Sequence, residues 1–383
     1  MKLRIHQQYF IDRNPDIHML LWSMRLGKSL PAKLWSLKPH RKGNVIIISM
    51  KSNKKDWQDL CPHATVYSKE EFKKVWKDIE NPTALIVDES HFFNSPLFVA
   101  KKRSAMAESL YNFISKHENL PRLFLSATPL SNEPASCHTA LTYLGHDIDW
   151  KKYRDIFYTL EKRPFLPYPA WLPNKDWRKE ANKMLERSSR ISIVSLQDCA
   201  DVPPETDEVL EVRGKKYEHD EEYHWTKEHR HAQTFKIPKI KELGYGHRKL
   251  IIVCHYTDTI DLYAKKLKGQ KDVFVLDGRT KDQGQIIKDA QESSDCYLIV
   301  QAQMGMGYDG YMFDAMVFTS MPHKVSYYSQ MRGRLVSLDH PKPRLYYHIL
   351  SGQWDKRIHK DVLNGEDFNI LKYEKVTNSI VID

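Results

Sequence analysis

Residues 20–29 constrain the fold most, because an apolar strand there runs directly into a Gly-Lys-Ser turn that opens a helix. Gly27 lacks a Cβ, so the backbone can approach a bound anion closely. The first amides of the helix point toward such an anion, and the helix dipole favours negative charge there. Lys28 can reach the outer phosphates of a nucleotide, and the Ser29 hydroxyl can ligate Mg²⁺. An ordinary strand–helix turn is the alternative, because Trp22 replaces the first glycine of the full phosphate-loop pattern.

A second apolar run, residues 84–87, leads directly into Asp88 and Glu89. Carboxylates are costly inside a buried strand, so we expect both at its exposed C-terminal tip. There Asp88 can hold Mg²⁺ through water, and Glu89 can orient and deprotonate an attacking water. An acidic turn without chemistry is the alternative. The Gly-Lys-Ser turn upstream favours the catalytic interpretation.

Two further strand ends carry polar residues. The strand at 122–125 ends in the letters SAT, whose hydroxyls belong to Ser126 and Thr128. These hydroxyls can bond to the acid pair and respond to the γ-phosphate, so we predict a coupling role. Lys51 follows the strand at 44–48, at the edge where open α/β sheets bind ligands. A solvated lysine turn explains Lys51 equally well.

The second half of the chain repeats the alternation of strand and helix. We expect strands at 249–253, 273–276, 296–300, 315–319 and 344–349. This alternation predicts a parallel sheet with right-handed crossovers. A chain of 383 residues favours two domains. Pro203 and Pro204 mark the expected boundary, which gives lobes at 1–205, with an irregular elaboration about 150–204, and at 206–383.

Only the first lobe has the Gly-Lys-Ser turn and the acid pair, so ATP is expected in the cleft between the two lobes. Hydrolysis there needs positive charge from the second lobe, and an arginine finger contributes about 10³–10⁵ in rate. Arg334, in the sequence QMRGR, is the candidate. Such an arrangement couples cleft closure to chemistry.

Charge and composition limit the class of protein. Lys and Arg number 59 against 49 Asp and Glu, a net charge of +10 that favours a polyanionic partner such as nucleic acid. A basic soluble enzyme is the alternative. Neither a signal-peptide core nor a membrane-spanning stretch is evident, so we expect a soluble, cytoplasmic protein without a membrane partner.

Metal chemistry other than that of Mg²⁺ is not favoured. The five cysteines are scattered and form no CxxC pair, which indicates a reducing compartment. The expected helix at 216–233 carries His224, Glu228 and His231 at a metal-like spacing. The helix is charged all round, so a solvated helix is favoured over a zinc site.

Eight segments in order, LRIHQ, MRLGKS, SMKS, DESH, SATPLSN, DGRT, GMGYDG and QMRGR, resemble the motifs of superfamily 2 helicases. Within them the chain looks most like the Swi/Snf-type DNA translocases, especially small phage and bacterial members. The resemblance extends from Leu3 to about Phe368. It implies an α/β fold of two tandem RecA-like parallel-sheet domains, with ATP and Mg²⁺ as cofactors in the cleft between them.

The resemblance also implies residue roles. Gln7 would contact adenine, although a surface glutamine is equally compatible with its spacing. The nucleotide-binding set is Gln7, Arg25, Leu26, Gly27, Lys28, Ser29, Gly307, Asp309 and Arg334, and Mg²⁺ would be held by Ser29 and Asp88. The catalytic set is Lys28, Asp88, Glu89, Gln330 and Arg334, with coupling through Ser126 and Thr128. The nucleic-acid set is Lys51, Ser52, Asn132, His255, Arg279 and Gln301, with contacts mainly to phosphates.

Two positions depart from the family pattern. Ser337 stands where the family has a second arginine after QMRGR, with Arg332 close by as a candidate substitute, and Arg25 stands where it has a glycine. These departures predict slow turnover or a stimulating protein partner.

Three hypotheses follow from the sequence. The leading one is a monomeric, nucleic-acid-dependent ATPase that translocates on duplex or forked DNA. The second is a strand-separating, fork-remodelling or annealing helicase with a wedge from residues 150–200. The third is an ATP-gated DNA-binding protein with little hydrolysis. RNA remains an alternative substrate, and a virus-encoded replication or repair factor in the host cytoplasm is expected.

Overall fold

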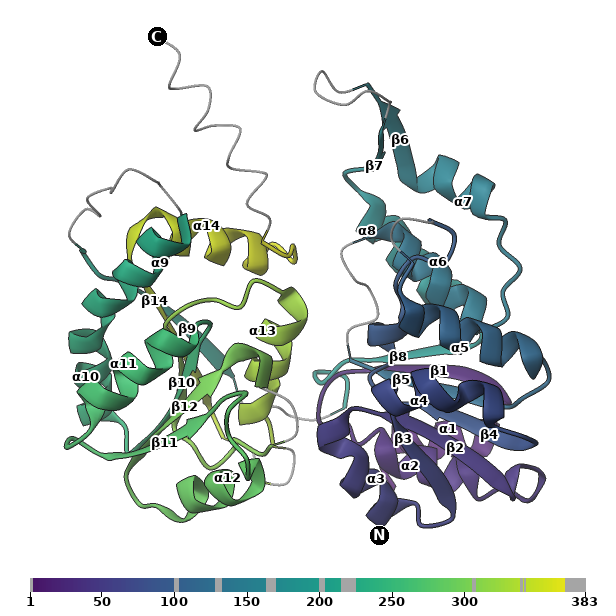
Figure 1. Ribbon diagram of the computed structural model, residues 1–383, viewed down its shortest axis with the longest axis horizontal. Coiled ribbons are helices and arrows are strands. Elements are labelled where there is room, and N and C mark those ends of the chain that lie inside the picture. The colour runs from purple at the N-terminus through teal and green to yellow at the C-terminus, as the bar shows by residue number, and fades with distance from the viewer. Residues whose placement is uncertain are drawn as a thin grey trace. The chain divides into compact units, whose positions relative to one another are not determined.

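The chain folds into two compact units, Met1–Ala200 and Asp201–Asp383, in the computed structural model (Figure 1). The structure describes residues 3–99, 103–127, 133–162, 170–199, 204–214, 225–304, 308–337, 340 and 342–368. Of the two expected boundary prolines, Pro204 is among the described residues and Pro203 is outside them. None of the helices in these ranges has the length and apolar character needed to cross a membrane.

The first unit is built on a six-stranded sheet of order β3-β2-β4-β5-β1-β8, with every pair parallel. Continuous apolar runs form its central strands because helices cover both faces. The strands are β1 (Ile17–Trp22), β2 (Asn44–Ser49), β3 (Ala64–Ser68), β4 (Pro82–Val87), β5 (Arg122–Ser126) and β8 (Ile191–Val194). The helices are α1 (Ile5–Arg13), α2 (Ser29–Ser36), α3 (Lys54–Leu60), α4 (Lys69–Val75), α5 (Ala105–Lys116), α6 (Pro134–Tyr143), α7 (Trp150–Phe157) and α8 (Trp177–Arg187).

Residues 150–204 are more regular than expected. They contain α7, α8 and an antiparallel hairpin of β6 (Tyr158–Glu161) and β7 (Ala170–Pro173). They also contain β8, which completes the main sheet beside β1. Strands of four residues are too short to show a periodic pattern in the sequence.

The second unit has a six-stranded parallel sheet of order β11-β12-β10-β13-β14-β9. Its strands are β9 (Glu205–Glu211), β10 (Lys249–Cys254), β11 (Asp272–Leu276), β12 (Cys296–Gln301), β13 (Ala315–Phe318) and β14 (Arg344–Leu350). Its helices are α9 (Trp225–Gln233), α10 (Ile237–Gly246), α11 (Thr257–Leu267), α12 (Gln283–Glu292), α13 (Val325–Arg332) and α14 (Gly352–Leu363). The two sheets confirm the predicted α/β class with two tandem parallel-sheet units.

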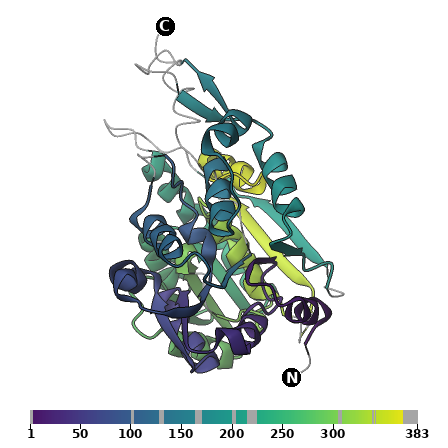
Figure 2. The same ribbon diagram turned by 90° about the vertical axis from the view of Figure 1, so that its right-hand side faces the viewer.

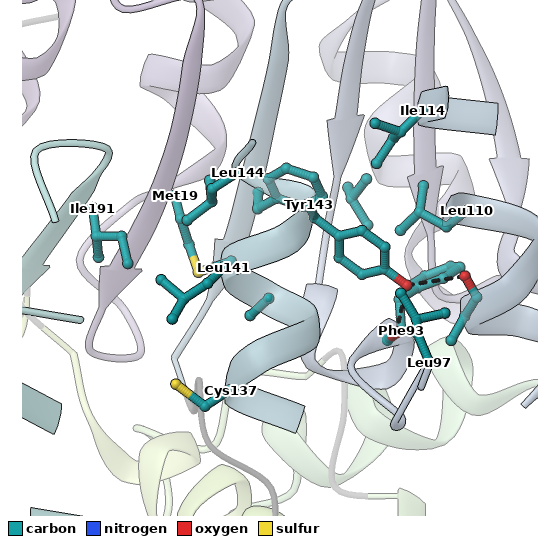
Figure 3. Close-up of a cluster of buried hydrophobic side chains, with 14 of the residues drawn as sticks. Met19, Phe93, Leu97, Leu110, Ile114, Cys137, Leu141, Tyr143, Leu144 and Ile191 are labelled. Carbon is teal, nitrogen blue, oxygen red and sulfur yellow. Dashed lines mark hydrogen bonds between the residues drawn. The ribbon is translucent and has the colours of Figure 1, made fainter. Parts of the chain in front are cut away.

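Tyr143 is central to the core of the first unit (Figure 3). Its ring stacks on Phe124 of β5 with centroids 5.9 Å apart. Its buried hydroxyl lies 2.9 Å from the carbonyl oxygen of Phe93 and 3.0 Å from that of Ala107, and its single proton can be donated to either. Tyr143 therefore joins α6 to β5, to α5 and to the segment that follows the acid pair.

We expect Tyr143→Phe to lower the free energy of unfolding by about 1–2 kcal/mol, because it leaves two buried carbonyls without this donor. Thermal unfolding of the intact chain measures the loss. Tyr245→Phe is the matched control, since Tyr245 is 83% exposed and its change should stay within about 0.5 kcal/mol. Equal stability of the two variants would contradict the role given to Tyr143.

Candidate functional site

Three neighbouring strands of the first unit deliver the predicted site residues to one edge. β5 lies between β4 and β1 in a parallel register. The Gly-Lys-Ser turn follows β1, the acid pair follows β4, and Ser126 is the last residue of β5. The carboxyl ends of parallel strands lie at one sheet edge, where open α/β sheets bind ligands.

The turn before α2 is held in an unusual backbone conformation. Gly27 has φ +70°, and a Cβ on it would lie 2.7 Å from the Nε2 atom of Gln7. Arg25 also lies in the left-handed region, with φ +66°. The family glycine at this position would adopt that conformation without strain. A side chain at position 27 would therefore collide with the amide of Gln7.

Gln7 shapes this turn from α1. Its Nε2 atom donates to the carbonyl oxygens of Leu26 (3.2 Å) and Gly27 (2.9 Å). Its Oε1 atom accepts from the backbone N–H of Arg4 at 2.9 Å. The side chain is 5% exposed, so Gln7 is not a surface glutamine. Its contact with adenine stays a prediction.

A cavity of about 570 Å³ lies beside α1, against β1 and β8. Arg4 and His6 line it and also contact the turn, through the carbonyl oxygens of Arg25 and Leu26. Its walls are mainly aromatic and apolar, and they include Tyr9, Phe10, Trp22 and Ile193. A cavity of this size and lining can accept a planar ring. The sequence analysis did not identify it.

Lys28 folds back onto its own turn. Its Nζ atom donates to the carbonyl oxygens of Trp22 (2.9 Å) and Ser23 (3.3 Å). Burial lowers the pKa of the Lys28 ammonium, while the carboxylates of Glu89 and Asp88 act in the opposite direction. The Lys28 ammonium already lies near the acid pair. Phosphate oxygens of a ligand could take the place of the two carbonyl oxygens as its acceptors.

Asp88 is fixed by two donors. Trp57 of α3 donates from Nε1 to Oδ2 at 2.9 Å, and the backbone N–H of Glu89 donates to Oδ1 at 3.0 Å. Burial, and then the charge of Glu89, raise the pKa of Asp88 to about 6. A divalent cation would offset both effects, so the donor set fits Mg²⁺. The sequence analysis missed Trp57, whose signal was an apolar residue within the basic run after β2.

His91 links the acid pair to β5. Its Nδ1 atom lies 3.3 Å from the hydroxyl of Ser126 and 3.3 Å from a carboxylate oxygen of Glu89. Glu89 itself has φ +47°, a left-handed conformation that is uncommon outside glycine and often marks a functional site. Ser126 thus reaches Glu89 through His91. The other coupling residue, Thr128, and the predicted nucleic-acid contact Asn132 lie outside the described residues.

The nucleic-acid residues predicted in the second unit lie at one sheet edge. His255 follows β10, Arg279 follows β11 and Gln301 ends β12, and these three strands are neighbours. Arg279 forms ion pairs with Asp261 (2.7 Å) and Asp277, and Gln301 accepts from the backbone N–H of Gly278 (3.3 Å). In the first unit, Lys51 and Ser52 are exposed just after β2. Phosphate contacts by these residues stay a prediction.

The predicted nucleotide residues of the second unit differ in exposure. Gln330 on α13 is buried, and Arg334 is 8% exposed. The Arg334 guanidinium donates to the carbonyl oxygen of Tyr308 at 3.2 Å. Asp309 is exposed, and its backbone carbonyl accepts from Gln291. Gly307 lies outside the described residues.

Arg332 has a structural partner. Its guanidinium forms an ion pair with Asp207 of β9 and lies 3.9 Å above the ring of Tyr346. It therefore joins the edge strand β9 to α13 and β14. This engagement argues against the suggestion that Arg332 substitutes for the arginine replaced by Ser337.

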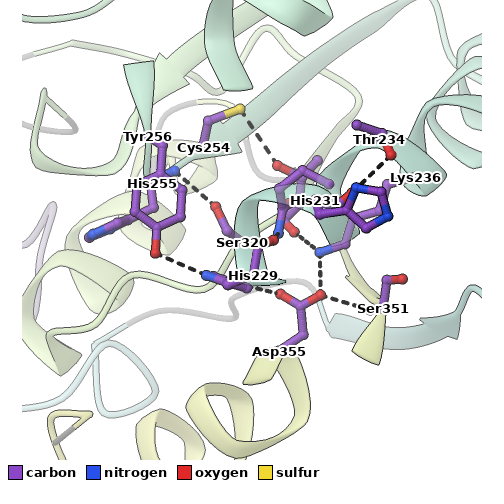
Figure 4. A network of polar contacts seen from close by, with 12 residues as sticks. His229, His231, Thr234, Lys236, Cys254, His255, Tyr256, Ser320, Ser351 and Asp355 are labelled. Carbon is purple, nitrogen blue, oxygen red and sulfur yellow. Dashed lines mark hydrogen bonds and ion pairs between the residues drawn. The ribbon is translucent and has the colours of Figure 1, made fainter. Parts of the chain in front are cut away.

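A buried polar network in the second unit was not predicted (Figure 4). Asp355 of α14 accepts from His229 Nε2 at 2.8 Å and pairs with Lys236 Nζ at 2.6 Å. His229 also contacts the hydroxyl of Tyr256, and the rings of His255 and His323 stack at 3.9 Å. Burial lowers the pKa of His255 to about 4. The network therefore supports the strand end that carries His255.

The α9 helix is consequently not the solvated helix that its charge pattern predicted. His229 and Gln233 on it are buried, and Glu228 accepts from the indole N–H of Trp354. Among the described residues no group of three or more His, Cys, Asp or Glu side chains can hold a metal ion. His224 lies outside them.

We expect Asp355→Asn to destabilise the second unit by about 3–5 kcal/mol, because it leaves the buried Lys236 charge without its counterion. Hydrogen exchange in β10 and α14 measures the effect locally. Glu242→Gln is the matched control, because it removes the partner of an exposed ion pair with Lys239 and should cost less than about 1 kcal/mol. Unchanged exchange in Asp355→Asn would contradict this account.

We expect the carboxyl of Asp88 to titrate near pH 6 in the nucleotide-free protein, and Glu89→Gln to lower that pKa by removing a like charge. The folded-state pKa lies above the ordinary 3.8. Protonation of Asp88 therefore adds to the free energy of unfolding as the pH falls through about 6 toward 3.8, and this contribution is lost as the pH rises through about 6. Carboxyl NMR checks the pKa, with Glu70→Gln as a control that should leave it unchanged. A wild-type value near 3.8 would refute the assignment.

Comparisons with known proteins bear on the second unit. Residues 236–338 match the family described as the helicase conserved C-terminal domain. No curated protein matches the sequence. Among solved structures, the Sulfolobus solfataricus SWI2/SNF2 ATPase core in complex with dsDNA is 13% identical, over 99% of this chain and 93% of that chain, with a TM-score of 0.43.

The family match covers β10 to β13 and the QMRGR segment. These are the strands that carry His255, Arg279 and Gln301, together with the region of Arg334. Residues 236–338 of the second unit are therefore similar to the helicase conserved C-terminal domain, in agreement with the resemblance of this part of the chain to superfamily 2 helicases.

Proposed function

We propose that the chain is a nucleic-acid-dependent ATPase that translocates on DNA. The observation that carries the proposal is the convergence of Lys28, the acid pair and Ser126 at the ends of three neighbouring strands. The helicase C-terminal domain in the second unit supports the same conclusion. In this proposal the first lobe, 1–205, binds ATP and the second, 206–383, completes the motor.

The residues of the first unit fit ATP and Mg²⁺. ATP supplies the phosphoanhydride bond whose hydrolysis drives the motor. Lys28 and the amides opening α2 would hold phosphates beside Gly27, while Ser29 and Asp88 would hold Mg²⁺. Glu89 would accept a proton from the attacking water. The turn residues Arg25 and Leu26 would hold the nucleotide through their backbone, and Gln7 would contact adenine.

The second lobe would contribute to the same nucleotide. In this proposal Arg334 and Gln330 approach the γ-phosphate from the opposite side of a cleft, with Gly307 and Asp309 nearby. An arginine in that role contributes about 10³–10⁵ in rate. Glu89 contacts His91, and His91 contacts Ser126. Through this link Ser126, together with Thr128, would respond to the state of the nucleotide site.

DNA would be gripped through its phosphates. Lys51, Ser52 and Asn132 in the first lobe and His255, Arg279 and Gln301 in the second are the proposed contacts. The net charge of +10 supports an electrostatic, salt-sensitive interaction that does not read sequence. Duplex or forked DNA is the proposed substrate of a monomeric, cytoplasmic protein, and RNA is the alternative.

An ATP-gated DNA-binding protein with little hydrolysis is the second candidate. Ser337 replaces a family arginine, and the ion pair of Arg332 with Asp207 engages the nearest replacement. The absence of that arginine would also explain slow intrinsic ATP turnover, which a protein partner would raise.

We expect wild-type ATP turnover to be stimulated by DNA, and Glu89→Gln to reduce turnover by about 10²–10⁴ while nucleotide binding persists. Lys28→Ala should lose binding itself, because it removes the phosphate-binding cation. Steady-state ATPase assays with and without DNA, paired with a nucleotide-binding assay, separate the two effects.

Matched controls exist on the same unit. Glu70→Gln and Lys55→Ala change exposed residues of the same types and should behave as wild type. Turnover retained by Glu89→Gln would overturn the catalytic assignment. DNA binding with negligible turnover in the wild type would favour the gated-binding alternative.

A further inference from the structure

The β6–β7 hairpin exposes an apolar face. Leu160 of β6 is directly opposite Trp171 of β7 in the antiparallel register, so the two side chains share one face. Leu160 is 50% exposed and Trp171 40% exposed, and Ile156 at the end of α7 is 63% exposed. Exposed apolar groups gathered on so small an element indicate an interaction surface.

The hairpin is firmly anchored to the first unit. Tyr158, the first residue of β6, is buried, and its hydroxyl accepts from the backbone N–H of Ala135 at 3.0 Å. Asn174, just after β7, donates to the carbonyl of Ile156 at 2.7 Å and accepts from Thr159 at 2.6 Å. Figure 1 and Figure 2 show both strands extending away from the main sheet. A rigidly mounted projection can transmit force.

Trp171 is oriented by a cation. The guanidinium of Arg154 on α7 lies 4.1 Å above the indole ring, and Arg154 is itself held by Asp155. Such a contact fixes the ring plane at little entropic cost, since indole has only two rotatable bonds. An indole fixed in this way, with part of its surface open, is suited to stacking.

The surroundings of the hairpin are basic. Residues 150–187 contain ten Lys and Arg against five Asp and Glu. This excess of five positive charges is half of the net charge of +10 of the chain. The exposed cations include Lys151, Lys152, Lys162, Lys175 and Lys179. Apolar side chains flanked by cations match a nucleic acid, whose bases stack on aromatic rings while its phosphates attract lysines. An apolar protein partner would not require this charge.

We propose that the Leu160–Trp171 face is a strand-separating wedge, which stacks on the terminal base pair of a duplex at a junction with single strands. The inference rests on the proposed function, because the motor supplies the movement that drives the duplex onto the wedge. It extends that function from translocation on DNA to separation of its strands at a fork. The anchoring contacts explain why the face holds its position under load.

The test compares Trp171→Ala with wild type on a forked DNA that carries fluorophores on its two strands. We expect strand separation to slow at least about fivefold, because stacking on one aromatic ring is lost. DNA-stimulated ATPase on an unforked duplex should change less than twofold, since Trp171 is not assigned to the nucleotide site. Trp171→Phe should restore most of the rate. Tyr245→Ala, which removes an aromatic ring that is 83% exposed in the second unit, is the control and should match wild type.

A binding assay without ATP separates failure of the wedge from failure of the motor. With 2-aminopurine in the terminal base pair of the fork, wild type should change the fluorescence and Trp171→Ala should not. Absence of DNA-stimulated ATPase in wild type would contradict the proposed function, while the fluorescence still tests the wedge. An unchanged fluorescence response in Trp171→Ala would overturn the wedge, and so would stimulated ATPase without strand separation in wild type. A protein partner would then be the occupant of this face.

Discussion

The parallel pairing of β5 with β4 and β1 is the constraint on which the candidate site depends. Leu21 pairs with Ser126, and Val87 pairs with Phe124, so the segments that follow the three strands leave the sheet at the same edge. A slip of one residue would move every side chain of a strand to the other face of the sheet. The apolar residues that fill the core therefore also fix where the Gly-Lys-Ser turn, the acids and the serine emerge.

The same edge of the sheet gathers a buried cation, two acids and two residues with a left-handed backbone. Lys28 relies on two backbone carbonyls, while burial and the nearby charge of Glu89 raise the pKa of Asp88. Arg25 and Glu89 have left-handed backbones that side chains disfavour. A polyanion with a divalent cation would relieve the electrostatic part of this cost, which supports the proposed nucleotide site.

Much of the architecture was predictable, because continuous apolar runs mark buried parallel strands and their polar ends mark the ligand edge. The contacts that tune the site were not. Trp57 reaches Asp88 across 31 residues of sequence, and His229 reaches Asp355 across 126. Pairings of that separation leave no local pattern. Nor could the exposed hairpin be recognised, because four-residue strands are too short to reveal a period.

The cations of the two units are held differently, and the difference bears on the proposed movement along DNA. Lys51 of the first unit is exposed after β2, whereas Arg279 of the second unit is paired with Asp261 and Asp277. In the proposed contact, a phosphate that binds Arg279 must compete with two carboxylates, and an exposed guanidinium gains little from any single ion pair. In a motor that must release DNA at every step, a weak contact of this kind is an advantage. In the proposed motor, the carboxylates beside Arg279 would lower its affinity for phosphate and so favour release of DNA, which a purely static DNA-binding protein would not need.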